Sequence, residues 1–160
     1  MGFALESPVG TLVLRAQHEA IVEIGFGGNF PAGKREGRAE PLLREAVQQL
    51  SAYFAGKLKE FDLPLAPEGS AFQRRLWRAL CQIPFGETRS YGELAGLLQS
   101  APRAIGGACG RNPIAIVIPC HRVLGKGFAL TGYSGGEGLR TKKFLLVLEG
   151  AWPPASSAAA

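Results

Sequence analysis

The sequence predicts an α+β fold, with a small N-terminal antiparallel sheet and a helix, then a mainly helical C-terminal domain that contains a helix-turn-helix. Three observations predict it. Strand-like segments separated by turns fill the first 26 residues. Helical periodicity begins at residue 40, and two short helical segments with only a small break between them lie between residues 91 and 110. With 160 residues, 46% of them hydrophobic and 19% charged, the chain can bury a core, which excludes a disordered or fibrous protein.

Three strands are predicted in the N-terminal part, at residues 3–6, 11–16 and 21–26. The turn Ser7-Pro8-Val9-Gly10 separates the first two, so we expect an antiparallel meander. A helix is predicted over 40–54 because apolar residues recur there every three to four positions, a pattern that packs one helix face on a sheet. The apolar stripe consists of Leu42, Leu43, Ala46, Val47, Leu50 and Phe54.

Residues 62–69 contain two prolines and a glycine without helical periodicity, which predicts an extended linker. We therefore expect an N-terminal α/β support domain at 1–67 and a C-terminal domain at 68–152, which contains the candidate functional residues described below. The Ala- and Ser-rich residues 153–160 are expected to form a disordered tail.

The positive charge of the chain is concentrated in its second part. Residues 1–67 carry seven Lys and Arg against eight Asp and Glu, whereas residues 68–160 carry eleven against five. The formal net charge of +5 therefore belongs to the C-terminal part, which makes an anionic partner worth testing.

The C-terminal part begins with three predicted helices. Ser70 can cap a helix that ends at Pro84 and Gly86, and Ser90 can cap a second helix at 91–98. Pro102, which is tolerated as a first helical residue, opens a third helix that runs to about Gly110. The small turn between the second and third helices predicts a helix-turn-helix. An apolar strand at 114–118 and a closing helix at 139–149 are expected to follow.

The second helix of this helix-turn-helix lacks side chains that read bases. Helices that read the major groove present Arg, Asn or Gln to base edges, whereas this helix presents small residues such as Ala104 and Gly107, with Arg103 before them and Arg111 after them. Small residues and one inserting Arg suit shape-based contact in the minor groove. An equally weighted alternative is that the glycines only permit tight helix packing. A transcriptional regulator is disfavoured because the helix has nothing to read a sequence with.

Cys120 is the candidate nucleophile, because it follows the predicted apolar strand between Pro119 and His121. A thiol with a pKa near 8.5 is only about 3% ionised at neutral pH, so it needs a base. We expect His121 to take the proton through a water or a rearranged turn, with Glu149 orienting the imidazole. The alternative is a structural cysteine beside a surface histidine. The three cysteines are odd in number and lack paired spacing, which favours a reducing compartment and argues against disulfides or a zinc knuckle.

Residues 119–123 read Pro-Cys-His-Arg-Val, a highly specific signature, and with it the chain resembles the O6-alkylguanine-DNA alkyltransferases. The resemblance covers essentially all of 70–150 and, more loosely, the N-terminal part. Its further motifs lie at 72–77, 83–91, 103–107, 112–113, 132–135, 145–150, 7–10 and 61–64. It implies a ribonuclease H-like N-terminal domain, a winged-helix-like C-terminal domain, and irreversible, stoichiometric transfer of the alkyl group from O6-alkylguanine in double-stranded DNA to a cysteine. Activity on O4-alkylthymine is left open.

The resemblance also implies a role for each matching residue. Cys120 resembles the alkyl acceptor. His121 resembles the base, and Glu149 resembles the carboxylate that orients it. Asn112 resembles the residue that braces the active-site turn. Tyr91 resembles the tyrosine that crowds the phosphate of the flipped nucleotide and donates toward guanine N3.

Two further sets follow from the resemblance. Arg103 resembles the arginine that fills the gap in the duplex, and the other DNA-binding residues are Tyr91, Ala104, Gly107 and Arg111. The residues expected to line the substrate pocket are Val123, Tyr133, Ser134 and Ala115. Lys142 also resembles a family lysine near the site, although the spacing before it differs by two residues.

No cofactor or metal is expected. Some relatives bind a structural zinc in the N-terminal domain through Cys and His, but residues 1–67 contain no Cys and only His18. Residues 28–34 resemble a phosphate-binding loop, yet Arg35 stands where Ser or Thr would hold magnesium, so no nucleotide cofactor is predicted.

The expected partner is duplex DNA rather than a membrane, because the longest apolar run, 114–118, is far shorter than a bilayer requires. We expect a monomer in the cytoplasm, or in the nucleus if the source is a eukaryote. The alternative function is a non-catalytic module that binds alkylated bases and recruits other repair factors. Relatives of that kind lack the acceptor cysteine, so Cys120 argues against it. Acyl hydrolysis is a more distant alternative, since no oxyanion motif stands out.

Overall fold

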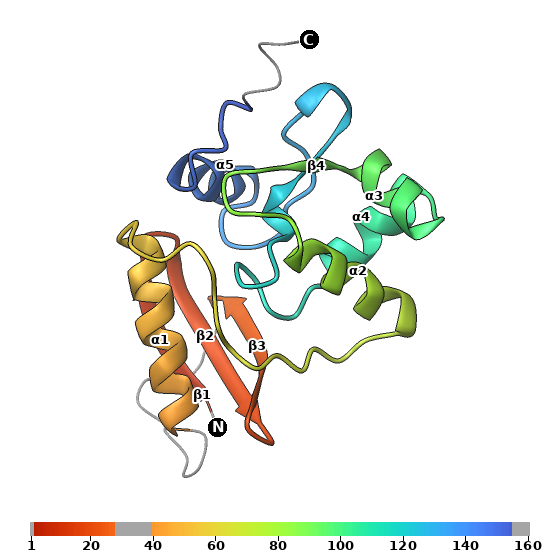
Figure 1. Cartoon of the computed structure of the whole chain (residues 1–160). Coiled ribbons are helices and arrows are strands. Elements are labelled where there is room, and N and C mark those ends of the chain that lie inside the picture. Colours follow the sequence, from red (N-terminus) through yellow and green to blue (C-terminus); the bar gives the residue numbers. More distant parts are fainter. Residues whose placement is uncertain (1, 28–39, 155–160) are drawn as a thin grey trace. The chain divides into compact units, whose positions relative to one another are not determined.

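The computed structural model describes residues 2–27 and 40–154 (Figure 1). The chain divides into two compact units, one formed by Met1–Glu68 with Pro113–Ala115 and the other by Gly69–Asn112 with Ile116–Ala160. The expected α+β class is confirmed. The phosphate-loop-like residues 28–34 and residues 155–160 of the predicted tail lie outside the described residues.

The first unit contains a three-stranded sheet of β1 (Gly2–Ser7), β2 (Gly10–Gln17) and β3 (Ala20–Phe26) in the order β1-β2-β3. Both pairs are antiparallel, so the predicted meander is confirmed. Gly10 adopts a φ of 98°, a conformation that suits glycine, and its carbonyl accepts a hydrogen bond of 2.6 Å from the Ser7 hydroxyl. These local contacts close the first turn.

Helix α1 (Glu40–Phe54) has the predicted bounds and packs on the sheet (Figure 1). Its inward face is fully buried at Leu43, Ala46 and Leu50, as the apolar stripe predicts. At the end of the helix Tyr53 is 1% exposed while Phe54 is only half-buried, so Tyr53 enters the core in place of the predicted Phe54.

Two segments from elsewhere in the chain pair with β3. The predicted linker is extended but not free, because the Ile21 amide donates to the Pro64 carbonyl and the Ala66 amide donates to the Ile21 carbonyl, both at 2.8 Å. Ile24 pairs in the same way with the segment around Ile114. These bonds satisfy backbone groups of β3 that would otherwise lack a strand partner.

The predicted strand at 114–118 is wrong. Only Ile114 forms a β-bridge, and the chain then turns, with Ile116 at a φ of 72°. Every residue of the run is nevertheless buried. Apolar character therefore reports burial correctly, but a short apolar run does not distinguish a buried strand from a buried turn. Cys120 consequently follows a buried turn and not a strand.

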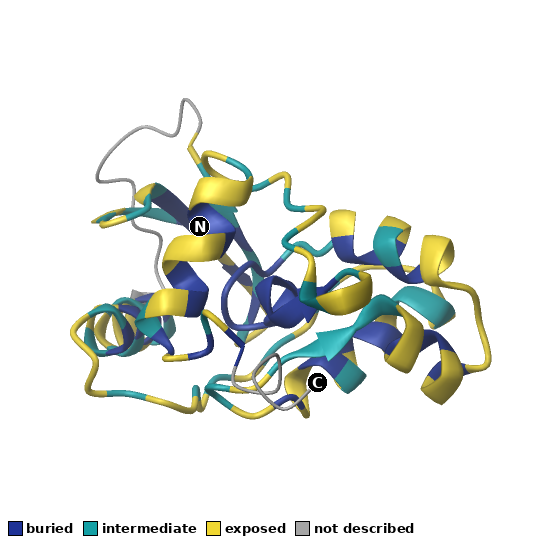
Figure 2. Ribbon diagram, turned by 90° about the horizontal axis from the view of Figure 1, so that it is seen from above, coloured by how far each residue is buried: buried dark blue, intermediate teal, exposed yellow. Residues whose placement is uncertain are grey.

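The second unit begins with α2 (Ala71–Cys81), α3 (Tyr91–Leu98) and α4 (Pro102–Gly110), as predicted. The hydroxyls of Ser70 and Ser90 accept hydrogen bonds from amides in the first turns of α2 and α3, and Pro102 is the first residue of α4. These helices carry buried residues on one side and exposed residues on the other (Figure 2). The helices α3 and α4 form the expected helix-turn-helix.

The rest of the second unit arranges the residues around Cys120. The short strand β4 (Arg89–Ser90) pairs in parallel with β5 (Val123–Leu124). Two 3-10 turns, η2 (Cys120–Arg122) and η3 (Lys126–Phe128), flank β5, and α5 (Leu139–Leu148) follows. Glu149 is the C-cap of α5, one residue beyond the helix, not its last residue as predicted. No helix in the described part of the chain is long and apolar enough to cross a membrane.

Candidate active site and DNA-facing helix

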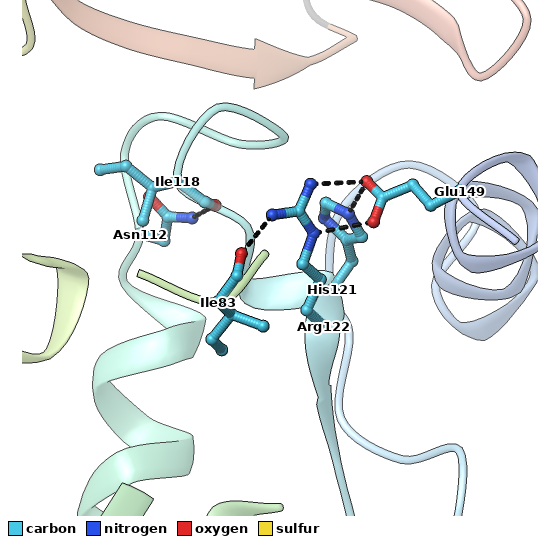
Figure 3. Close-up of polar contacts among 6 residues, drawn as sticks. All are labelled: Ile83, Asn112, Ile118, His121, Arg122 and Glu149. Carbon is cyan, nitrogen blue, oxygen red and sulfur yellow. Dashed lines mark hydrogen bonds and ion pairs between the residues drawn. The ribbon is translucent and has the colours of Figure 1, made fainter. Parts of the chain in front are cut away.

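Cys120 lies in a tight turn that Asn112 braces. The Cys120 amide donates to the Ile118 carbonyl at 2.8 Å, and Pro119 between them has a φ of −83° and a ψ of 65°, as in an inverse γ-turn. Asn112 Nδ2 donates to the Ile118 carbonyl at 2.9 Å (Figure 3). The same Nδ2 donates to Cys120 Sγ at 3.2 Å. Asn112 therefore contacts both the backbone of the turn and the sulfur.

The Cys120 thiol is buried, with an exposed fraction of 8% for the residue. Burial raises the pKa of Cys120, and the Asn112 hydrogen bond and the Lys142 charge oppose this rise without cancelling it. The sulfur is therefore protonated at neutral pH and needs a base before it can attack.

His121 is placed to be that base. Its Nε2 lies 2.7 Å from Glu149 Oε2, and both side chains are fully buried. Because an ionised carboxylate only accepts, Nε2 carries the hydrogen and Nδ1 keeps its lone pair. Nδ1 is buried and has no hydrogen-bond partner among the described residues. Burial lowers the pKa of His121 more than Glu149 raises it, so the imidazole is neutral at pH 7.

Arg122 completes this cluster and was missed in the sequence. Its Nε and Nη2 donate to Glu149 Oε1 and Oε2 at 2.7 and 3.1 Å, and its Nη1 donates to the Ile83 carbonyl at 2.7 Å. Figure 3 shows His121 and Arg122 converging on the Glu149 carboxylate. The only sequence signal was its place in the Pro-Cys-His-Arg-Val signature, because its partner lies 27 residues away.

The Glu149 carboxylate stays ionised despite its burial. Burial raises the pKa of Glu149, but hydrogen bonds and charge from His121 and Arg122 outweigh this effect and lower the pKa to about 2. An ionised carboxylate can hold the imidazole hydrogen on Nε2 across the physiological pH range.

Lys142 is fully buried and connects two segments near Cys120. Its Nζ donates to the carbonyls of Val123 and Thr131, both at 2.5 Å. Burial lowers the pKa of Lys142 to about 8, although the charges of Cys120 and Cys109 oppose this shift. Lys142, which the resemblance suggests as a lysine near the site, therefore lies beside the Cys120 turn.

Tyr91 lies next to the Cys120 segment because it directly follows β4, which pairs with β5. Its hydroxyl contacts the carbonyls of Thr131 and Gly132 at 3.4 and 3.3 Å. Lys142 Nζ lies 5.7 Å from the centre of the Tyr91 ring. The Tyr91 hydroxyl must leave the Thr131 and Gly132 carbonyls before it can donate to another group.

The expected pocket residues lie in different surroundings. Val123 is buried. Burial raises the pKa of the Tyr133 hydroxyl, and the nearby Cys120 raises it further when its sulfur is ionised. Ser134 is exposed. Ala115, by contrast, belongs to the segment that joins the first unit, where its amide donates to the Ile24 carbonyl at 2.9 Å.

The four residues expected on the DNA-facing side of α4 and just after it are all exposed: Arg103, Ala104, Gly107 and Arg111. A Cβ atom added to Gly107 would meet nothing within 4 Å. The packing interpretation of this glycine is therefore wrong. The other side of α4 is fixed by Trp77, whose Nε1 donates to the Ala108 carbonyl at 3.0 Å.

Within residues 2–27 and 40–154, no group of three His, Cys, Asp or Glu side chains lies close enough together to hold a metal ion.

Comparisons with known proteins cover both units. The family model described as the DNA binding domain of 6-O-methylguanine DNA methyltransferase matches residues 71–151, and that of its ribonuclease-like domain matches residues 4–67. The methylated-DNA–protein-cysteine methyltransferase of Methanosarcina acetivorans is 49% identical to this chain, over 91% of this chain and 95% of its own length. That of Mycolicibacterium paratuberculosis is also 49% identical, over 95% of this chain and 93% of its own length. The structure of Mycobacterium tuberculosis OGT in complex with DNA is 42% identical, with a TM-score of 0.79, over 96% of this chain and 95% of that one.

Proposed function

Because the chain belongs to the 6-O-methylguanine DNA methyltransferase family, we propose that Cys120 is its alkyl acceptor and that O6-alkylguanine in duplex DNA is its substrate. The observation that carries this assignment is the buried cluster around Cys120, in which the sulfur accepts from Asn112 and the next residue, His121, is a neutral base held by Glu149. Cys81 and Cys109 have no such base beside them in the sequence.

The protein is a methyltransferase that binds DNA and repairs it by direct reversal of damage. The non-catalytic binding module is not favoured. Such a module needs no acceptor, whereas this chain keeps a cysteine in the Pro-Cys-His-Arg-Val signature.

The proposed transfer needs only groups that the second unit supplies. The thiol proton of Cys120 passes through a water to Nδ1 of His121, and the thiolate attacks the alkyl carbon in line with the carbon–oxygen bond. That bond breaks, its electron pair goes to guanine O6, and the purine takes up a proton to become guanine. The products are S-alkylcysteine and repaired DNA. The thioether is stable, so each molecule acts once. The protein is proposed to act as a monomer and without a cofactor.

The proposed substrate must leave the base stack to reach a buried sulfur. A damaged, poorly paired base costs less to extrude than an intact one. The smooth exposed side of α4 suits close approach to the minor groove, and Arg103 at its start would fill the space left by the flipped base. Tyr91 would then turn its hydroxyl from the Thr131 and Gly132 carbonyls toward guanine N3.

The proposal is tested by mass spectrometry after incubation with a duplex that contains one O6-methylguanine. We expect one methyl group per protein molecule, on the peptide that contains Cys120, and none on peptides with Cys81 or Cys109. A duplex with unmodified guanine is the control. A methyl group on another residue, or none on any, contradicts the assignment.

Arg103→Ala is expected to slow transfer from duplex DNA far more than transfer from free O6-methylguanine base. The reason is that Arg103 would stabilise only the flipped state of the duplex. Rates on the two substrates measure this difference, and Arg140→Ala, which removes another exposed positive charge, from α5, is the control. Equal losses on both substrates would remove the proposed role.

Gly107→Ala is expected to stabilise the protein by about 0.5–1 kcal/mol, because alanine favours a helix over glycine, and yet to weaken binding to duplex DNA. The new methyl group meets nothing in the protein but stands on the side proposed to face the minor groove. Gly96→Ala, in an equally open position of α3, is the control. Urea unfolding and fluorescence anisotropy measure the two effects. Unchanged affinity for DNA would contradict the proposed contact.

A further inference from the structure

The guanidinium of Arg122 is bound on two sides by groups that are distant in sequence. Two of its nitrogens donate to the two oxygens of Glu149, and a third donates to the Ile83 carbonyl. The Arg122 side chain is 8% exposed and that of Glu149 is fully buried. This paired geometry fixes the plane of the carboxylate as well as its position.

The same carboxylate creates a difficulty for the proposed chemistry. A buried carboxylate that accepts from an imidazole favours the imidazolium form, and an imidazolium cannot take a proton from Cys120. The charged groups that act on His121 are Glu149 at the end of α5, which favours the charged form, and Arg122 in η2 and Lys142 in α5, which oppose it. Burial acts in the same direction as the two cations and is the largest effect. Of the two cations, only Arg122 is hydrogen-bonded to Glu149.

We propose that Arg122 is a positioning residue that fixes the Glu149 carboxylate and offsets its charge, so that His121 is oriented by Glu149 and still neutral when Cys120 has to lose its proton. This inference rests on the proposed function for the transfer step, but the state of His121 can be measured without any transfer. Arg122 thus acts through Glu149 and His121 and does not contact the substrate.

The first test is a titration of the histidine side chains by NMR. The chain contains only two histidines, His18 and His121, and His18 is exposed in the first unit, so it serves as an internal reference. In Arg122→Met, the Glu149 carboxylate that contacts His121 loses the cation that offsets its charge. We therefore expect the midpoint of His121 to rise by about one pH unit or more, which is the usual effect of an uncompensated neighbouring carboxylate. An unchanged midpoint of His121 in folded Arg122→Met would overturn the proposal.

The second test is the pH dependence of the transfer rate. The acidic limb of the profile of Arg122→Met should move to higher pH together with the midpoint of His121, so that the loss of transfer is largest in acidic buffer and is partly recovered in more alkaline buffer. A merely structural role predicts a loss by the same factor at every pH, and that result would overturn the proposal. Failure of the unaltered protein to methylate Cys120 would instead contradict the proposed function and leave the histidine titration to decide the role of Arg122.

Arg122→Lys covers the case in which Arg122→Met does not fold. Lysine keeps the positive charge but cannot form the paired contact with both carboxylate oxygens. We expect the His121 midpoint to stay within about half a pH unit of the unaltered protein, while the transfer rate falls by a similar factor at every pH. A midpoint that rises as far as expected for Arg122→Met would overturn the charge offset. His18→Gln, far from this cluster in sequence, should leave the transfer rate unchanged and assigns the NMR signals.

Discussion

Cys120→Ser is expected to abolish alkyl transfer while leaving the affinity for duplex DNA intact. A hydroxyl is far harder to ionise than a thiol, and the neutral His121 next to it is too weak a base to compensate. The loss should be on the order of 10³-fold or more, as for other enzymes that lose their nucleophile. Single-turnover assays with a methylated duplex measure the rate, and electrophoretic mobility shifts measure the affinity. Binding should survive because the exposed residues of α4 are unchanged.

Cys81→Ser is the matched control, because it makes the same substitution at the exposed end of α2. We expect this variant to transfer the methyl group at the rate of the unaltered protein. If Cys120→Ser still accepts a methyl group, or if Cys81→Ser loses transfer to the same extent, the acceptor has been misassigned. Affinity lost together with transfer in Cys120→Ser would indicate that the serine has disturbed the fold, which circular dichroism would reveal.

Most helices and strands could be predicted because their signals are local. Ser70, Ser90 and Pro102 act within one turn of the helix that each begins, and the structure places those helix starts where the sequence predicts them. The meander follows equally from neighbouring segments and a four-residue turn. Interactions that span only a few residues leave their pattern in the sequence itself.

The strand predicted at 114–118 was wrong because the conformation of this segment is not set by local signals. Its conformation depends on β3, to which Ile114 is bridged, and on the turn that Asn112 braces from six residues before Ile118. Neither contact leaves a periodic signal. The same limit applies to the site. Arg122 and Lys142 are charged side chains that would ordinarily be assigned to the surface, and only partners 11 to 39 residues away reveal why they are buried.

Glu149→Ala is expected to destabilise the protein by about 3–5 kcal/mol, because it leaves the buried guanidinium of Arg122 without its counterion. Transfer should be lost as well, since nothing then holds the hydrogen of His121 on Nε2. Glu137→Ala is the matched control. Its ion pair with Arg140 is 3.4 Å long and its side chain is 70% exposed, so its removal should cost less than about 1 kcal/mol. Urea unfolding at pH 7, followed by circular dichroism, measures both changes.

The loss of unfolding free energy in Glu149→Ala should depend on pH if its origin is electrostatic. The pKa of Glu149 is about 2 in the folded protein and 4.5 for an ordinary glutamate, so the folded state binds the proton less readily than the unfolded state. The stabilisation by the ionised carboxylate is therefore complete above pH 4.5 and is lost as the pH falls toward 2. The gap in unfolding free energy between the unaltered protein and Glu149→Ala should accordingly narrow as the pH falls below 4.5. A gap that stays the same down to pH 3 would mean that packing, and not the ionised contact with Arg122 and His121, makes Glu149 necessary.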